Sequence, residues 1–95
     1  MNLQEITSAM EDLSNWGLEG SNSLTKQFEF IDFKESIEFV NKIAEVSEKA
    51  EHHPDITIRN NFVVLSLTSD IGELTEKDFA LAKDIDSITS PLNKV

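Results

Sequence analysis

Apolar and polar positions follow two different periods along the first third of the chain. Near the N-terminus, apolar side chains recur three or four positions apart, which is typical of one stripe on a short helix: Leu3, Ile6, Met10 and Leu13. From residue 24 the period is two, which predicts a half-buried strand with these positions on one side: Leu24, Lys26, Phe28 and Phe30. Trp16, Leu18 and the turn-like residues 20–22 predict a short strand that completes a first hairpin.

A long helix is predicted over residues 32–51. Asp32 and Glu35 form a capping-box pattern at its start. Its apolar positions form two neighbouring rows, namely Ile37, Val40 and Ala44, and beside them Phe39, Ile43, Val46 and Ala50. A helix that covers one side of a sheet needs an apolar stripe of roughly 100°, and this surface is wider. Either the helix lies in a deep groove of its own domain, or the outer row packs against a second subunit.

The rest of the pattern predicts a second hairpin, a loop over residues 70–73 and a last helix. Pro54 directs the residue before it into extended backbone, so the chain leaves the long helix at His53. The defining positions are Ile56 and Ile58, a turn at Asn60-Asn61, Val63, Leu65 and Leu67, a helix start at Thr75 and Asp78, and a helix end at Pro91. The order helix, strand pair, helix, strand pair, helix predicts an α+β two-layer sandwich. We expect a four-stranded antiparallel sheet with helices on one face, in a single domain over residues 1–95.

Composition and charge exclude several classes of function. The chain has 95 residues, with 18 acidic against 8 basic, so its formal net charge is -10. This excess of negative charge repels nucleic acids and anionic membranes, so we expect neither as a direct partner. No cysteine is present for disulfides or thiolate metal sites, and no glycine-rich phosphate loop occurs. The N-terminus lacks the pattern of a secretion signal, and the uncharged run over residues 60–69 is too short to span a bilayer, which predicts a cytoplasmic protein.

The adjacent His52 and His53 are the candidates for chemistry. They lie where a helix ends, and the negative end of the helix dipole stabilises a protonated imidazole there. Glu48 is four residues before His52, which predicts that its carboxylate faces that ring. This corner suits acid–base chemistry, but histidines at helix ends are also common structural caps. A metal site with Glu48 and Asp70 is less favoured, because adjacent side chains on extended backbone point apart.

Residues 48–54 read Glu-Lys-Ala-Glu-His-His-Pro, an acidic residue followed by three spacers and His-His-Pro. This run resembles the signature of the pterin-4a-carbinolamine dehydratase family. Further stretches that resemble the family follow in the same order: Trp16, residues 26–33, residues 55–56 and residues 74–78. The resemblance extends over about residues 12–88 and agrees with the predicted order of elements.

The resemblance implies a specific reaction. Family members dehydrate 4a-hydroxytetrahydropterin to quinonoid dihydropterin without a metal or organic cofactor, and they are homodimers or homotetramers. By resemblance, His52 and His53 would be catalytic and Glu48 would orient them. The substrate would also meet Pro54, Thr68 and Ser69.

One position departs from the family pattern. The family has a third histidine after the fourth strand, usually in Thr-Thr-His or Ser-Thr-His, whereas this chain has Thr68-Ser69-Asp70. An aromatic residue of the preceding hairpin is replaced by Asn60. A carboxylate is ionised near neutral pH and is a poor acid there, so Asp70 implies weakened catalysis. The alternative is a non-catalytic assembly protein or transcription cofactor built on the same scaffold, with a protein partner.

Overall fold

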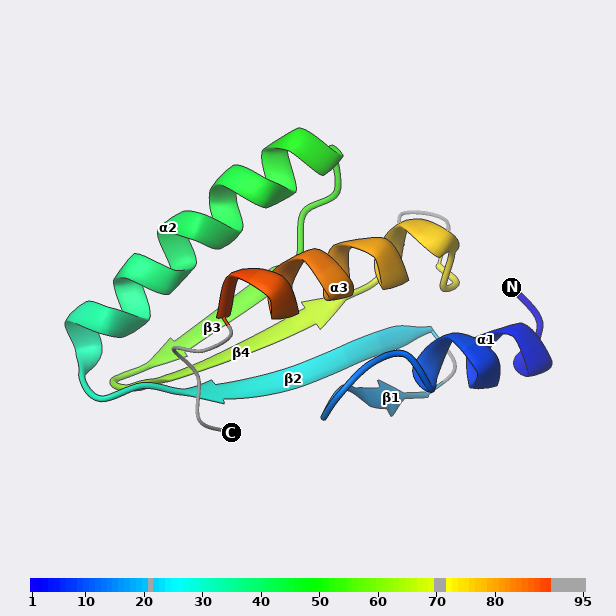
Figure 1. The fold of residues 1–95 in the computed structure, drawn as a ribbon, viewed down its shortest axis with the longest axis horizontal. Helices are drawn as coiled ribbons and strands as arrows, with labels where there is room; N and C mark the ends of the chain where they lie inside the picture. Colours follow the sequence, from blue (N-terminus) through cyan, green and yellow to red (C-terminus); the bar gives the residue numbers. More distant parts are fainter. Residues whose placement is uncertain (21, 70–71, 90–95) are drawn as a thin grey trace.

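In the part of the chain that the structure describes, residues 1–20, 22–69 and 72–89, three helices and four strands follow in the predicted order. The structure is a computed structural model (Figure 1). Its elements are α1 (Leu3–Met10), β1 (Gly17–Glu19), β2 (Ser23–Glu29), α2 (Phe33–Ala50), β3 (Asp55–Arg59), β4 (Phe62–Leu67) and α3 (Glu76–Thr89). The expected α+β class is therefore confirmed. The predicted helix end at Pro91 lies outside the described residues.

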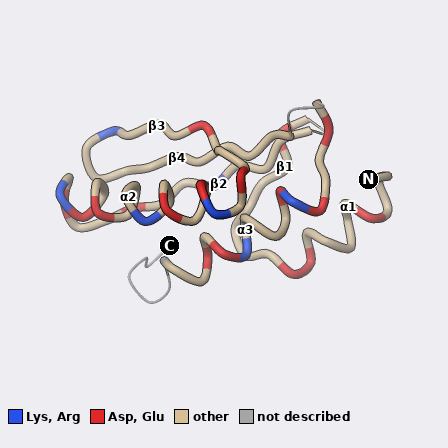
Figure 2. Tube along the Cα trace, turned by 90° about the horizontal axis from the view of Figure 1, so that it is seen from above, with Lys and Arg blue, Asp and Glu red and all other residues tan. Residues whose placement is uncertain are grey.

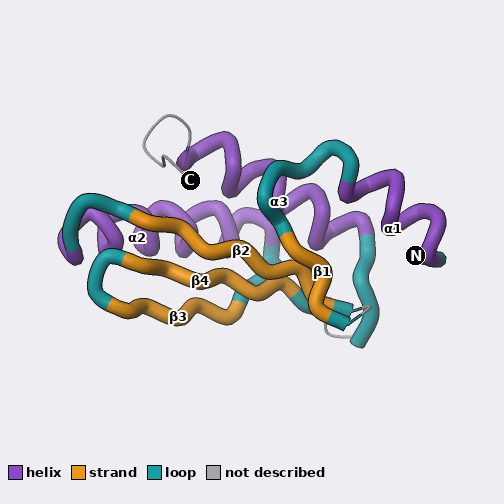
Figure 3. The backbone as a smooth tube through the Cα atoms, turned by 90° about the horizontal axis from the view of Figure 1, so that it is seen from below, coloured by secondary structure: helices purple, strands orange, loops and turns teal. Residues whose placement is uncertain are grey.

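The four strands form one antiparallel sheet in the order β1-β2-β4-β3. Helices α2 and α3 lie on one face of this sheet, and the opposite face is left uncovered by the described residues (Figure 3). Phe28 of β2 pairs with Val63 of β4, and both side chains are fully buried beneath the helices. The period of two in the sequence thus corresponds to one covered and one open face.

Aromatic rings fill the space between the sheet and α2. The Phe39 ring centroid lies 4.8 Å from that of Phe28 and 4.9 Å from that of Phe30. Trp16 meets the edge of Phe28 at 6.2 Å. Leu3, in contrast, is 71% exposed, so the predicted α1 stripe is wrong at this position. Leu3 directly follows the N-cap Asn2 in a helix of eight residues, and only Ile6 of α1 is buried.

Helix α2 begins where the sequence predicts and buries a narrower face than expected. The Asp32 side chain accepts a hydrogen bond from the Glu35 amide at 2.8 Å, which caps the first turn. Its buried residues are Ser36, Phe39, Ile43 and Ser47. Ile37, Val40 and Val46 are half-buried, whereas Ala44 and Ala50 are exposed, so the two rows do not lie in a deep groove of this chain. The two serines let the helix approach its neighbours closely, which apolar periodicity alone does not indicate.

The second hairpin has the predicted turn. Asn60 adopts φ 55°, the left-handed conformation that Asn tolerates. The Asn61 side chain donates to the Phe30 carbonyl at 3.1 Å and its own carbonyl accepts from the Phe30 amide at 2.8 Å, which ties this turn to the end of β2. Among the described residues, β3 pairs only with β4 and is thus an edge strand. None of the helices within those residues is long and apolar enough to cross a membrane.

Candidate functional site

The end of α2 sets the positions of both histidines. Glu51 follows the helix with φ 53°, in the left-handed region. The His52 amide then donates to the Ser47 carbonyl at 3.1 Å, the six-residue hydrogen bond of a Schellman motif. The helix therefore stops before His52, and Pro54 keeps the following chain extended toward β3. Both imidazoles lie on the connection between α2 and β3.

The His52 ring is held by a carboxylate from the last helix. Its Nε2 atom is hydrogen bonded to Oδ1 of Asp78, a residue that is fully buried at the start of α3. The other oxygen of Asp78 accepts from the Thr75 amide at 2.9 Å. The His52 side chain is only 11% exposed. These contacts fix the ring between two helices, because a buried carboxylate needs its hydrogen-bond partners.

The His53 ring lies in a different environment. Its Nε2 atom contacts Oε2 of Glu48, and the two side chains are 63% and 75% exposed. The i, i+4 spacing predicts Glu48 beside His52, and the structure corrects this pairing. Because α2 ends at Ala50, His52 turns toward Asp78 and the Glu48 carboxylate meets the next ring instead.

The contacts with the carboxylates also indicate which nitrogen of each imidazole remains available for a further hydrogen bond. An ionised carboxylate only accepts hydrogen bonds, so we assign a proton to Nε2 of each imidazole, which contacts its carboxylate. Nδ1 is then left as the acceptor in the neutral ring and as the second donor in the protonated ring. The two adjacent imidazoles thus differ in their surroundings. The His52 ring is largely buried and held by Asp78, whereas the His53 ring is exposed to solvent.

The sheet register brings the other predicted site residues to the same end of the molecule. Asp55 faces Ser66 in the antiparallel β3–β4 pair, which directs residues 52–54 and 67–69 to one sheet end. The Thr68 hydroxyl lies 2.5 Å from that of Ser23, and the Ser69 carbonyl accepts from the Gly72 amide at 3.0 Å. Pro54 is half-buried. Asp70 lies outside the described residues.

A hollow of about 550 Å³ adjoins this end of the sheet. Its lining residues are Met1, Glu5, Ser69, Thr75, Glu76 and Lys77, so it separates α1 from the start of α3 and does not contact the imidazoles. Within the described ranges, no three His, Asp or Glu side chains converge to hold a metal ion.

The sequence predicts only one of the two contacts that Asp78 makes. The spacing of Thr75 and Asp78 predicts a helix start, and the Asp78 carboxylate does accept from the Thr75 amide there. Its second contact, with His52, joins residues 26 positions apart. The available signal is an acidic residue at the third helical position of an otherwise apolar face, but its partner depends on how α3 packs against α2.

Comparison with known proteins agrees with the resemblance in the sequence. The family model described as Pterin 4 alpha carbinolamine dehydratase matches residues 1–88. A Trichormus variabilis protein provisionally named a pterin-4-alpha-carbinolamine dehydratase is 51% identical over 85 residues, which are 88% of this chain and 90% of the relative. A Chloroflexus aggregans protein of the same provisional name is 47% identical, with the same coverage of both chains.

Two solved structures share the fold. A transcriptional coactivator/pterin dehydratase from Brucella melitensis superposes with a TM-score of 0.86 at 28% identity, over 93% of this chain and 96% of the other. A pterin dehydratase-like protein identified as a RuBisCO assembly factor superposes with a TM-score of 0.72 at 25% identity, over 81% and 92% of the two chains.

Proposed function

The chain belongs to the pterin 4 alpha carbinolamine dehydratase family, and we propose that its His52–His53 corner dehydrates a 4a-hydroxytetrahydropterin to the quinonoid dihydropterin. The observation that carries this assignment of roles is the pair of adjacent imidazoles, each bonded through Nε2 to a carboxylate of its own. Residues 1–95 would act as one domain.

The reaction needs one proton donor and one proton acceptor. The bond between C4a and its hydroxyl breaks, the oxygen leaves as water with a proton from an acid, and a base removes the proton of the neighbouring ring nitrogen. We assign the base to Nδ1 of His52, because the buried Asp78 carboxylate stabilises the imidazolium that forms, as a buried Asp does in a catalytic triad. We assign the acid to His53, whose exposed ring can regain its proton from water.

The test is the loss of the 4a-hydroxy adduct in a stopped-flow assay. The wild-type chain should accelerate this loss over buffer, and His52→Ala and His53→Ala should each reduce the acceleration by a factor of about 10² to 10⁴. Asn41→Ala, an exposed α2 position, is the control and should retain the rate. No acceleration by the wild-type chain would exclude the enzyme.

Asp70 in the place of the third histidine stays a prediction from the sequence. If it occupies that place, Asp70→His adds an acid–base group, and the dehydration rate should rise by about tenfold or more. An unchanged rate would mean that Asp70 does not lie near the reacting atoms, and Glu73→His, at an exposed position of the same connection, serves as the control.

An assembly role is the second candidate function. It is favoured by the similarity to the pterin dehydratase-like RuBisCO assembly factor. We would expect such a protein to retain a specific protein partner in extracts of its own cells, with His52→Ala leaving that capture unchanged. Capture of nothing but further copies of this chain would argue against the role.

We also propose a homodimer or homotetramer formed through β3 and α2. Ile56 and Ile58 of the edge strand are 37% and 38% exposed on the helix side of the sheet, and the α2 residues Ile37 and Val40 are half-exposed. Ile58→Lys should produce monomers in sedimentation equilibrium. Thr57→Lys, whose side chain lies on the open face of the same strand, should not.

The cytoplasmic location expected from the sequence stays a prediction, which fractionation of the source cells tests.

A further inference from the structure

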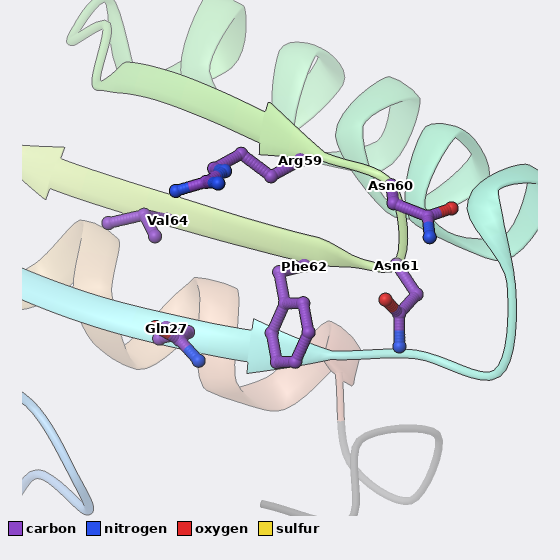
Figure 4. Close-up of a pocket in the computed structure, with 6 residues that line it drawn as sticks. All are labelled: Gln27, Arg59, Asn60, Asn61, Phe62 and Val64. Atoms are coloured by element: carbon purple, nitrogen blue, oxygen red, sulfur yellow. The ribbon is translucent and has the colours of Figure 1, made fainter.

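The open face of the sheet carries a hollow far from the histidines. It has a volume of about 650 Å³ and lies at the β3–β4 turn, at the opposite end of β3 from His53. Its lining residues are Gln27, Arg59, Asn60, Asn61, Phe62 and Val64, and we call it the open-face pocket (Figure 4). This volume falls within the range of about 300–1,000 Å³ typical of small-molecule sites.

The lining of the open-face pocket contrasts with the charge of the chain. Acidic residues are spread over all three helices (Figure 2) and outnumber basic ones by 18 to 8. The pocket lining, however, contains no carboxylate and one cation, Arg59, which is the only arginine in the sequence. Glu29 is the nearest carboxylate on this face by register, because it pairs with Phe62, which in turn pairs with Arg59. No ion pair joins Arg59 to Glu29 or to any other described residue.

The polar groups of the pocket are available in different degrees. Within the described ranges, the Arg59 guanidinium and the amides of Gln27 and Asn60 make no hydrogen bond with other side chains or backbone. The Asn61 amide nitrogen is committed to the Phe30 carbonyl, which keeps the turn rigid. The pocket therefore offers one cation and two free amides on a fixed hairpin.

The arrangement of the side chains indicates the shape of a ligand. In Figure 4 the Arg59 side chain runs along β4 toward Val64, and the Phe62 ring lies over β2. The half-buried ring and the Val64 side chain form an apolar floor, on which a flat ring can stack. A guanidinium binds a carboxylate through two parallel hydrogen bonds. A phosphate ester would bring nearly two negative charges to a site with one cation, so a monocarboxylate fits the charge better.

We propose that the open-face pocket binds a small planar aromatic carboxylate, with Arg59 on the carboxylate and the ring against Phe62. The free amides of Gln27 and Asn60 would bond polar ring substituents. This site is separate from the proposed dehydratase corner, and pairing of the β3 edge with a second copy would leave it open.

The test follows the amide signals of the isotope-labelled full chain by NMR during titration with benzoate. Benzoate should shift the signals of residues 59–64 and of Gln27 saturably, whereas neutral benzamide should bind at least about tenfold more weakly. Arg59→Gln should weaken benzoate binding by about tenfold or more. Lys42→Gln removes the same charge from an exposed α2 position and should leave the affinity within about twofold.

Five outcomes would overturn the proposal. The first is no saturable shift in the pocket, and the second is equal binding of benzoate and benzamide. The third is equal affinity of Arg59→Gln and the wild-type chain for benzoate, as would follow if benzoate bound beside His52 and His53 instead. The fourth is that a second copy of the chain covers the pocket. In that case Arg59→Gln would break the oligomer into monomers, which sedimentation equilibrium detects. Tetraglutamate binding as tightly as benzoate would likewise contradict a site for planar rings. Arg59 is exposed, so its variant should keep the wild-type melting temperature.

Discussion

Helix α3 contributes a carboxylate to each of two clusters, and the clusters differ in what they leave available. Near its end, Asp86 accepts from the Lys26 ammonium at 2.9 Å and from the Trp16 indole at 3.0 Å. The same ammonium donates to the Ser14 carbonyl at 2.9 Å and lies 5.0 Å from the Phe28 ring centroid. At the start of the helix, Asp78 accepts from His52 and from the Thr75 amide.

The difference lies in the donors. A lysine ammonium and an indole N–H donate hydrogen bonds and accept none, so the Asp86 cluster fastens the chain before β1 and strand β2 to α3 without offering a proton acceptor on these donors. An imidazole bonded through one nitrogen keeps a second nitrogen for proton transfer. One carboxylate of α3 therefore stabilises the fold, and the other orients the imidazole to which we assign the proton transfer. Stability and activity should respond separately to changes at the two ends of this helix.

The largest loss of stability is expected at Lys26. Lys26→Met keeps much of the side-chain volume but removes both hydrogen bonds of the ammonium, including its ion pair with Asp86. The Lys26 side chain is 7% exposed, so the free energy of unfolding should fall by about 3 kcal/mol. Urea unfolding measures this, and the dehydration rate per folded molecule should not change. Lys42→Met on the exposed side of α2 is the control, and a loss no larger than its own would show that the cluster is unimportant.

An intermediate loss of stability, together with a loss of rate, is expected at Asp78. In Asp78→Asn, the amide group must point its N–H donors at either the His52 ring or the Thr75 amide, both of which donate. Unfolding free energy should fall by about 1–3 kcal/mol, and the dehydration rate by a factor of about 10². Asp84→Asn, exposed on the same helix, should change neither quantity. A variant with normal rate would leave Asp78 as a helix cap alone.

The smallest effect is expected at Glu48. Its contact with His53 is exposed, so water can replace it, and Glu48→Gln keeps an oxygen that accepts from the ring. Urea unfolding should detect a change within about 0.5 kcal/mol, and the rate should fall by less than the factor of about 10² expected for Asp78→Asn. Glu45→Gln is the matched control one turn earlier. A loss of rate as large as that of Asp78→Asn would mean that the His53 ring depends on its carboxylate as strongly as the His52 ring does.

Sequence patterns predicted the elements of this fold because those patterns are local. The alternation through Phe28, the Asp32 cap and the Asn60-Asn61 turn depend on neighbours a few residues away, and each is found in the structure. The same alternation puts Lys26 on the side of Leu24 and Phe28, which is the buried side in the structure. That an ammonium can be buried there depends on Asp86, which is 60 positions further along the chain.

The partners within the site could not be predicted in the same way. The spacing of Glu48 and His52 suggests a contact only if the helix continues through both residues, and the left-handed Glu51 ends it. The Asp78–His52 contact requires α2 and α3 to be packed together first. The open-face pocket likewise requires the register of three strands, since Gln27, Arg59 and Val64 come from β2, β3 and β4.

The double contact of Asp78 affects the order in which the protein can mature on the ribosome. His52 is synthesised 26 residues before the carboxylate that holds it. Nascent chains that lack α3 therefore contain both histidines and all four strands of the sheet, yet they cannot hold the His52 ring in place. Translation must pass Asp78, and α3 must leave the exit tunnel and dock, before the His52 ring acquires the position seen in the structure.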